Sequence, residues 1–187
     1  MNNYTLILAS GSPRRKQILT EAGISFFVKP ADIDEENYPS KLSVYEVPAY
    51  LAKLKAEAIT ISDSELVLAA DTVVIIDNTI LGKPSDSSAA FNMLKQLSGR
   101  MHQVVTGVCI KSHDKTFIFS DTTEVYFKAL TEEEILFYIE KFKPFDKAGG
   151  YGIQEWIGMV GVEKINGSFY NVMGLPIVPI YEYLKNF

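Results

Sequence analysis

The most unusual chemistry in this sequence lies in the stretch ASGSPRRKQIL, residues 9–19, where a predicted helix opens on consecutive cations. Ser12 is a good N-cap and Pro13 suits the first helical position. The first turn then carries three cations: Arg14, Arg15 and Lys16. Unpaired backbone N–H groups already make this end of a helix positive, so each cation is unfavourable by up to about 1 kcal/mol unless an anion is present. The pattern indicates an anion site, with three solvent-facing side chains as the alternative.

A carboxylate and a lysine near a predicted hairpin form the second feature. Asp71 interrupts the apolar run 66–76, and a bare carboxylate is costly to bury. It must therefore be paired, bind a metal or face a cleft, although an aspartate satisfied by backbone N–H groups fits equally well. A tight turn at residues 77–78 would carry Lys83 back alongside Asp71 and Thr72. Contact between Lys83 and Asp71 is a hypothesis, and a surface lysine is the alternative.

Three further features point to phosphate chemistry. The loop PADIDEENYPS is acidic, a predicted helix carries Lys53 and Lys55, and the loop DKAGGYGIQ has three glycines within residues 149–152. Glycines let a backbone approach a ligand closely and can form an anion-binding nest, although a plain flexible loop is the alternative. Several cations with at least two carboxylates suggest a polyphosphate substrate bridged by a hard divalent metal. Neither GxxxxGK[ST] nor a GxGxxG after a strand is present.

Alternating short elements must position these residues. The predicted strands are residues 6–9, 25–28, 65–78, 79–84, about 103–111, 116–127 and 159–167. The predicted helices are residues 13–22, 43–59, 85–99, 131–142 and about 176–184. Hairpins and helices in this order imply an α/β fold with a mixed sheet and helices on its faces.

Composition narrows the class of protein. The chain has 187 residues, of which 47% are hydrophobic and 22% charged, as in an ordinary globular protein. A net charge of −5 argues against general nucleic-acid affinity, because that requires a broad basic face. The single cysteine, Cys109, excludes an internal disulfide and reads as a core thiol. No signal-peptide pattern and no membrane-spanning apolar run is present, so we expect a cytoplasmic protein without membrane partners.

Taken in order, the motifs resemble those of the Maf family, the septum-formation-associated nucleotide pyrophosphatases. The matching segments are SGSPRR, DE in the acidic loop, KLKA, ADTVV, LGKP, SGRMHQVVTGV, DKAGGYGIQ and INGSFYNVMGLP. Each motif is weak alone, but the series runs from residue 6 to residue 176. The resemblance implies a single domain over residues 1–187 with an elongated α/β fold like that of the inosine triphosphate pyrophosphatases. It also implies two lobes around a central cleft, a homodimer, and metal-dependent cleavage of nucleoside triphosphates to the monophosphate and pyrophosphate.

The resemblance also implies roles for residues. Asp71 falls on the family's catalytic proton acceptor, and Glu35 on a carboxylate that binds metal or acts as a second acid or base. The catalytic set is Asp71, Glu35 and Lys83; the substrate-binding set is Ser10, Arg14, Arg15, Lys55, Thr72 and Gln154. Glu35 and Asp71 would hold Mg²⁺ or Mn²⁺. SPRR, ADTVV and GYGIQ resemble the branch that acts on dTTP and UTP; the branch for 7-methyl-GTP differs where Arg14, Thr72 and Gln154 stand.

Alternatives from other classes stay open at this point. A nucleotide-sensing regulator of septum formation or cell division would bind nucleotide with little turnover. A pyrophosphatase of inosine or 7-methylguanosine triphosphate is the nearest enzymatic rival. A nucleic-acid-binding module is disfavoured by the acidic charge.

Overall fold

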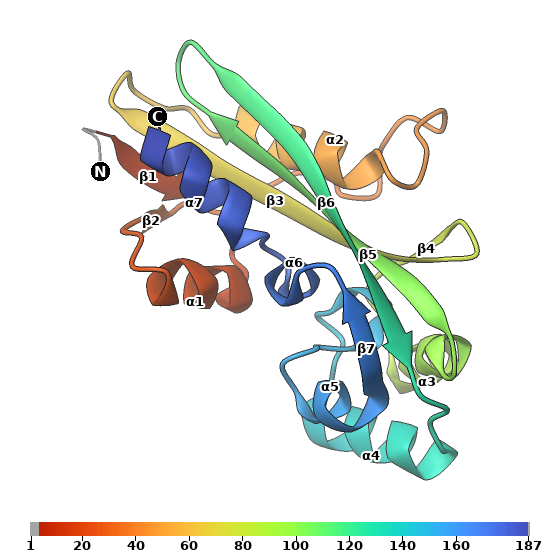
Figure 1. Cartoon of the computed structure of the whole chain (residues 1–187). Coiled ribbons are helices and arrows are strands. Elements are labelled where there is room, and N and C mark those ends of the chain that lie inside the picture. The colour runs from red at the N-terminus through yellow and green to blue at the C-terminus, as the bar shows by residue number, and fades with distance from the viewer. Residues whose placement is uncertain (1–3, 187) are drawn as a thin grey trace. The chain divides into compact units, whose positions relative to one another are not determined.

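The sheet has the mixed character that the sequence predicts. The computed structural model describes residues 4–186, so residues 1–3 and 187 of the predicted domain lie outside the described residues. Within this range, seven strands form one sheet in the order β2-β1-β3-β5-β6-β7, with β4 paired to β3 (Figure 1). The strands are β1 (Thr5–Leu8), β2 (Phe27–Val28), β3 (Glu65–Ile76), β4 (Thr79–Leu81), β5 (Met101–Lys111), β6 (Thr116–Phe127) and β7 (Val162–Asn166). β1 runs parallel to β2 and β3, whereas β4 and β7 run antiparallel to β3 and β6.

Helices flank this sheet, which confirms the predicted fold class. They are α1 (Pro13–Glu21), α2 (Val47–Glu57), α3 (Ser87–Leu97), α4 (Glu132–Phe142), α5 (Trp156–Gly161), α6 (Phe169–Met173) and α7 (Ile177–Asn186), with a 3₁₀ turn over Ala148–Gly150. No helix within residues 4–186 is long and apolar enough to cross a membrane.

The chain divides into two compact units, each assembled from several segments. Unit 1 comprises Met1–Asp71, Thr106–Asp121 and Gly174–Phe187; unit 2 comprises Thr72–Val105 and Thr122–Met173. The long strands β3, β5 and β6 each contribute residues to both units. The single domain and the cleft between two lobes stay predictions.

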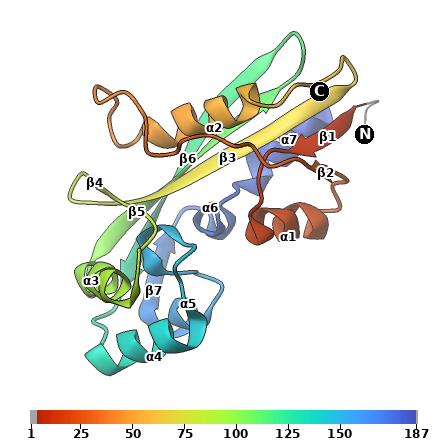
Figure 2. The same cartoon turned by 180° about the vertical axis from the view of Figure 1, so that it is seen from behind.

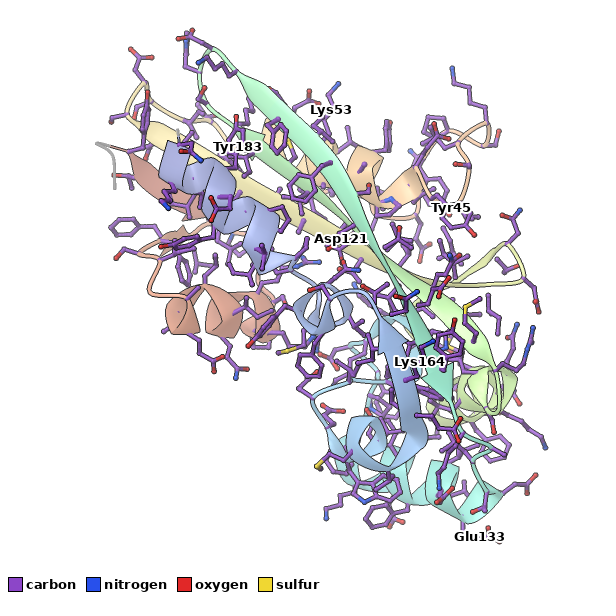
Figure 3. The ribbon with its side chains drawn as sticks, in the orientation of Figure 1. Tyr45, Lys53, Asp121, Glu133, Lys164 and Tyr183 are labelled. Carbon is purple, nitrogen blue, oxygen red and sulfur yellow. The ribbon has the colours of Figure 1, made fainter. Side chains whose placement is uncertain are left out.

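In unit 1, α2 and α7 lie on opposite faces of the sheet (Figures 1 and 2). The face under α2 holds one buried cluster: Ile7, Ala9, Ala52, Ala56, Ile59, Val67, Ala69 and Cys109. Its strand members alternate along β1 and β3, as one face of a sheet requires. On α7, Tyr183 (labelled in Figure 3) stacks on Phe117 of β6, with ring centroids 4.3 Å apart. Cys109 is 1% exposed, which confirms the core thiol.

Two element predictions were wrong in part, and one short helix was missed. The helix predicted from residue 43 begins at Val47, because Pro48 lacks an N–H and is tolerated only in a first turn. The strand predicted from residue 159 begins at Val162, since residues 156–161 form α5 instead. The short helix α6, over residues 169–173, was not predicted.

Candidate functional site

The cationic helix start is formed as the sequence predicts. Ser12 caps α1 by accepting from the backbone N–H of Arg15, Pro13 occupies the first turn, and no acidic residue lies there. The Arg15 side chain folds back on the chain: its Nε donates to the Gly174 carbonyl at 2.8 Å and its Nη1 to Ser10 Oγ at 3.1 Å. Ser10 is 8% exposed and also accepts from the Ser12 backbone N–H. The guanidinium is therefore held in one orientation by two acceptors.

Arg15 interacts electrostatically with both predicted carboxylates of unit 1, Asp71 and Glu35. Burial lowers the pKa of the Arg15 guanidinium from its ordinary value, while Asp71 and Glu35 act to raise it and Arg14 acts with burial. A guanidinium keeps its proton in proteins, so Arg15 remains a fixed cation between a neighbouring cation and two anions. Arg14 itself is half-buried, next to it in the chain.

The centre of the unit 1 site is a lysine shared by two carboxylates. Lys55 Nζ lies 2.7 Å from Glu35 Oε1 and 2.7 Å from Asp71 Oδ1. Lys55 and Asp71 are 6% and 7% exposed, whereas the Glu35 side chain is 41% exposed. The sequence left open whether a buried Asp71 is paired, and this ion pair gives the answer. A buried carboxylate with an ammonium partner avoids most of the cost of an isolated charge.

Three different elements bring these groups together. Asp71 lies inside β3, Glu35 lies on the loop between β2 and α2, and Lys55 lies in the last turn of α2, where the helix dipole favours a cation. The second lysine named from the sequence lies elsewhere: Lys53, labelled in Figure 3, is exposed and lies 3.6 Å from Glu57. Two residues along a helix turn the side chain by about 200°, slightly more than a half-turn, so Lys53 and Lys55 face opposite ways.

The donor set fits a hard divalent cation. Oxygens of Glu35 and Asp71 converge on a single cationic atom, and carboxylate oxygens are the ligands that Mg²⁺ and Mn²⁺ prefer. Within residues 4–186 no three Asp, Glu, His or Cys side chains gather as a metal site. Mg²⁺ in phosphate-handling sites usually takes one or two carboxylates and completes its shell with phosphate and water oxygens.

The remaining predicted residues, Thr72, Lys83 and Gln154, belong to unit 2. The turn at Asp77 and Asn78 has positive φ at both residues, +50° and +58°, as a tight hairpin requires. The register pairs Val74 with Leu81, and its continuation would bring Lys83 opposite Thr72. Lys83 is exposed and Thr72 half-buried. Contact between Lys83 and Asp71 stays a prediction.

Gln154 is exposed and follows the glycine-rich segment. Gly149 and Gly150 have φ of +67° and +71°, which explains glycine at both positions. Tyr151 is buried, and its hydroxyl lies 2.7 Å from His102 Nε2. Burial lowers the pKa of His102 to about 3 and raises that of Tyr151, so the hydrogen bond joins two neutral side chains. Tyr151 therefore anchors this segment in the core of unit 2.

Sequence reasoning missed several residues that organise these groups. Gly174, which accepts from Arg15, lies in the INGSFYNVMGLP motif, but a backbone acceptor leaves no signal in residue type. Lys147 and Glu155 flank the glycine-rich segment and form an ion pair at 3.1 Å. The opposite charges of these two residues, one on each side of the segment, could have been used to predict the ion pair from the sequence.

Unit 1 thus brings together a fixed arginine, a buried lysine and two carboxylates, and guanidinium and ammonium groups are donors that suit phosphate oxygens. The model of the Maf-like proteins matches residues 5–187, and the chain belongs to this family. A Parabacteroides distasonis protein named dTTP/UTP pyrophosphatase is 49% identical over 189 residues, covering 100% of this chain and 98% of that protein. A Porphyromonas gingivalis W83 protein of the same name is 51% identical, covering 100% and 96%.

Among solved structures, the Staphylococcus aureus Ham1 protein has a TM-score of 0.44 and 16% sequence identity to this chain. The match covers 66% of this chain and 71% of that one.

Proposed function

We propose that this protein hydrolyses dTTP and UTP to the nucleoside monophosphate and pyrophosphate. The observation that carries the proposal is the buried Asp71–Lys55 pair with the exposed Glu35 on the same lysine, beside the fixed cation Arg15. The chain also belongs to a family whose relatives carry the name dTTP/UTP pyrophosphatase. Such a set can bind a triphosphate and accept a proton from water in the same place.

Each of these groups has a role in the proposed reaction. The oxygen of a water molecule attacks the α-phosphorus and loses its proton to the Asp71 carboxylate. The bond between the α-phosphorus and the bridging oxygen breaks, and pyrophosphate leaves with that oxygen. Arg14, Arg15, Lys55 and Lys83 balance the negative charge that shifts from the α-phosphate to the leaving group. Ser10 fixes the Arg15 guanidinium and provides a hydroxyl at the phosphates.

Glu35 and Asp71 would hold Mg²⁺ or Mn²⁺. A bound divalent cation would supply charge neutralisation at the phosphate oxygens. The exposed Glu35 side chain would bring its carboxylate to the metal, while Lys55, in contact with both carboxylates, would keep the remaining charge of the pair balanced.

The proposal assigns base recognition to Gln154, with Thr72 and Arg14 as further specificity residues. Uracil and thymine present an N3–H donor between two carbonyl acceptors. A glutamine amide can accept from N3–H and donate to O4 together. Cytosine has an acceptor at N3 and an amino donor at C4, so a fixed amide faces it with mismatched groups. The thymine methyl adds no polar group and should matter little.

A substrate panel with separate detection of pyrophosphate and orthophosphate tests the proposal. The kcat/KM for dTTP and UTP should exceed that for CTP, ATP and GTP by at least about tenfold, the lower end of one lost polar contact. Orthophosphate as the main product, or a preference for inosine triphosphate or 7-methyl-GTP, would contradict it. Binding of UTP without turnover would favour the nucleotide-sensing regulator instead. The homodimer and the cytoplasmic location stay predictions.

A further inference from the structure

The backbone around Gln154 is a closed turn. The Glu155 N–H donates to the Gly152 carbonyl at 3.0 Å, so Gln154 holds the third position of a four-residue turn. Ile153, at the second position, is 4% exposed and anchors the turn in the core of unit 2. The backbone therefore fixes where the Gln154 side chain starts, but it leaves open which way the terminal amide faces.

Three side chains of unit 2 form a polar cluster against this turn: Tyr138 of α4, Lys147 and Glu155. Glu155 Oε2 accepts from the Tyr138 hydroxyl, and Glu155 Oε1 lies 3.1 Å from Lys147 Nζ. The Tyr138 hydroxyl in turn accepts from the Gly152 N–H at 3.0 Å. Both oxygens of the Glu155 carboxylate are thus held, one by a cation and one by a phenol.

Burial restricts the movement of the side chains in this cluster. Tyr138 is fully buried and Lys147 is 8% exposed. Burial raises the pKa of Tyr138 above its ordinary value, and the Glu155 carboxylate adds to the rise, so the phenol keeps the proton that it donates. Lys147 Nζ also lies 2.7 Å from Asp146 Oδ1, which gives the buried ammonium a second anion. Buried charges held from several sides have little freedom to move.

Gly152 links the cluster to Gln154. A Cβ at this position would lie 3.0 Å from Glu155 Cδ, 3.0 Å from Lys147 Cε and 3.1 Å from Gln154 Nε2. The space above the Gly152 Cα is therefore shared by the ion pair and the Gln154 amide. Two carboxylates, Glu155 and Asp146, face the single ammonium of Lys147, so the cluster keeps a net negative charge. A negative charge attracts an amide NH₂ group and repels an amide oxygen, so the cluster favours the flip that turns Nε2 toward it.

The amide flip matters for the choice of base. With its oxygen toward N3–H and its nitrogen toward O4, a glutamine amide suits uracil or thymine; the reverse flip suits the N3 acceptor and amino donor of cytosine. We propose that Lys147, Glu155 and Tyr138 are positioning residues that hold the Gln154 amide in the flip that reads uracil or thymine. This inference rests on the proposed function, because it takes Gln154 as the residue that reads the base.

The test compares kcat/KM for UTP and for CTP in Lys147→Met and Glu155→Gln. The UTP-to-CTP ratio should fall by about tenfold in each, with CTP turnover rising in absolute terms. Lys147→Met releases the Glu155 carboxylate from its place and Glu155→Gln removes its charge, and a freely turning Gln154 amide serves both bases. Lys147→Arg should restore most of the ratio. If these residues had a purely structural role, the substitutions would lower kcat/KM for UTP and for CTP together and leave the ratio unchanged. Lys128→Met, which removes an ion pair with Glu134 in the same unit, is the matched control and should keep the wild-type ratio.

Tyr138→Phe keeps the ring and removes only the hydroxyl. If Lys147→Met does not fold, Tyr138→Phe replaces it in the test and should lower the UTP-to-CTP ratio in the same direction. In a Gln154→Ala background, Glu155→Gln should change the ratio by less than about twofold, since the coupling acts through the Gln154 amide. Suppose that Gln154→Ala flattens the UTP-to-CTP ratio while Lys147→Met and Glu155→Gln both leave it intact. This result would overturn the inference and leave the proposed function standing. A ratio unaffected by Gln154→Ala would overturn the assignment of Gln154 in the proposed function, and the inference with it.

Discussion

At the scale of single residues, the unit 1 site depends on charge balance. One buried lysine serves two carboxylates, and Arg15 adds a cation whose pKa both carboxylates influence. The two cations and two carboxylates of this set balance one another, so a substitution that removes one charge leaves a net charge on the remaining groups. Asp71 is the residue whose chemical role and structural role can be separated most cleanly.

Asp71→Asn should lower kcat by about 100- to 10,000-fold, the usual loss when a general base is removed. The amide has nearly the same shape and its oxygen can still accept from Lys55, so the folded structure should persist. Turnover of UTP and the denaturation midpoint measure the two effects. Near wild-type turnover in a folded Asp71→Asn protein would remove Asp71 from the mechanism.

His102 allows a pH prediction at the same scale. Its pKa falls from 6.5 to about 3 on burial, so between these values the unfolded chain binds a proton that the folded chain does not. The free energy of unfolding should therefore fall as the pH is lowered from 6.5 toward 3. At pH 5 the loss from this residue is about 2 kcal/mol.

Denaturant unfolding of wild type and His102→Gln at pH 7 and pH 5 measures this loss, which the variant should lack. His113 is the matched control: it is exposed, and its hydrogen bond to Asp114 raises its pKa, which is the opposite sign. His113→Gln should therefore keep the loss at pH 5. An equal loss in wild type and His102→Gln would show that His102 is not held neutral.

At the scale of elements, the close approach of α2 to β5 positions Lys55. A Cβ on Gly107 of β5 would lie 2.2 Å from the backbone of Pro48 and Ala49, at the start of α2. Only glycine lets the two backbones meet, and α2 carries Lys55 to Glu35 and Asp71 from that contact onward.

Gly107→Ala should lower the free energy of unfolding by about 3 kcal/mol or more, since backbone atoms cannot move aside as side chains do. The kcat should fall as well, because a displaced α2 draws Lys55 away from Asp71. Gly82→Ala is a stability control, as no atom lies within 4 Å of the added Cβ there. A wild-type denaturation midpoint for Gly107→Ala would contradict this contact.

The elements also show how far the sequence could lead. Caps and turns were predictable because they depend on neighbouring residues: Ser12 and Pro13 at α1, and Asp77 and Asn78 at the hairpin. The partners of Asp71 and Arg15 were not, because Lys55 and Gly174 are distant in sequence and only the tertiary structure brings them close. The helical start of the segment 159–167 was missed because a short apolar run fits a helix or a strand equally well.

At the scale of the whole molecule, the proposed reaction needs a net cationic setting for a triphosphate on a protein of net charge −5. The proposed reaction therefore relies on cations that act locally, and a divalent metal would add positive charge at the phosphates. This makes metal removal informative for the molecule as a whole.

Activity on UTP should vanish in excess chelator and return on addition of Mg²⁺ or Mn²⁺, because the carboxylates proposed as ligands, Glu35 and Asp71, offer hard oxygens. Glu35→Gln should raise the metal concentration needed for half-maximal activity, as one charged ligand is lost. Full activity in excess chelator would show that the metal has no part in the reaction.

The most direct test of the central claim follows the oxygen that enters the product. UTP is hydrolysed by the wild-type protein in ¹⁸O-labelled water, and mass spectrometry then measures the label in UMP and in pyrophosphate. Attack at the α-phosphorus predicts one ¹⁸O atom in UMP and none in the pyrophosphate released. Label in pyrophosphate, or label in orthophosphate as the main product, would place the attack on another phosphorus and contradict the account.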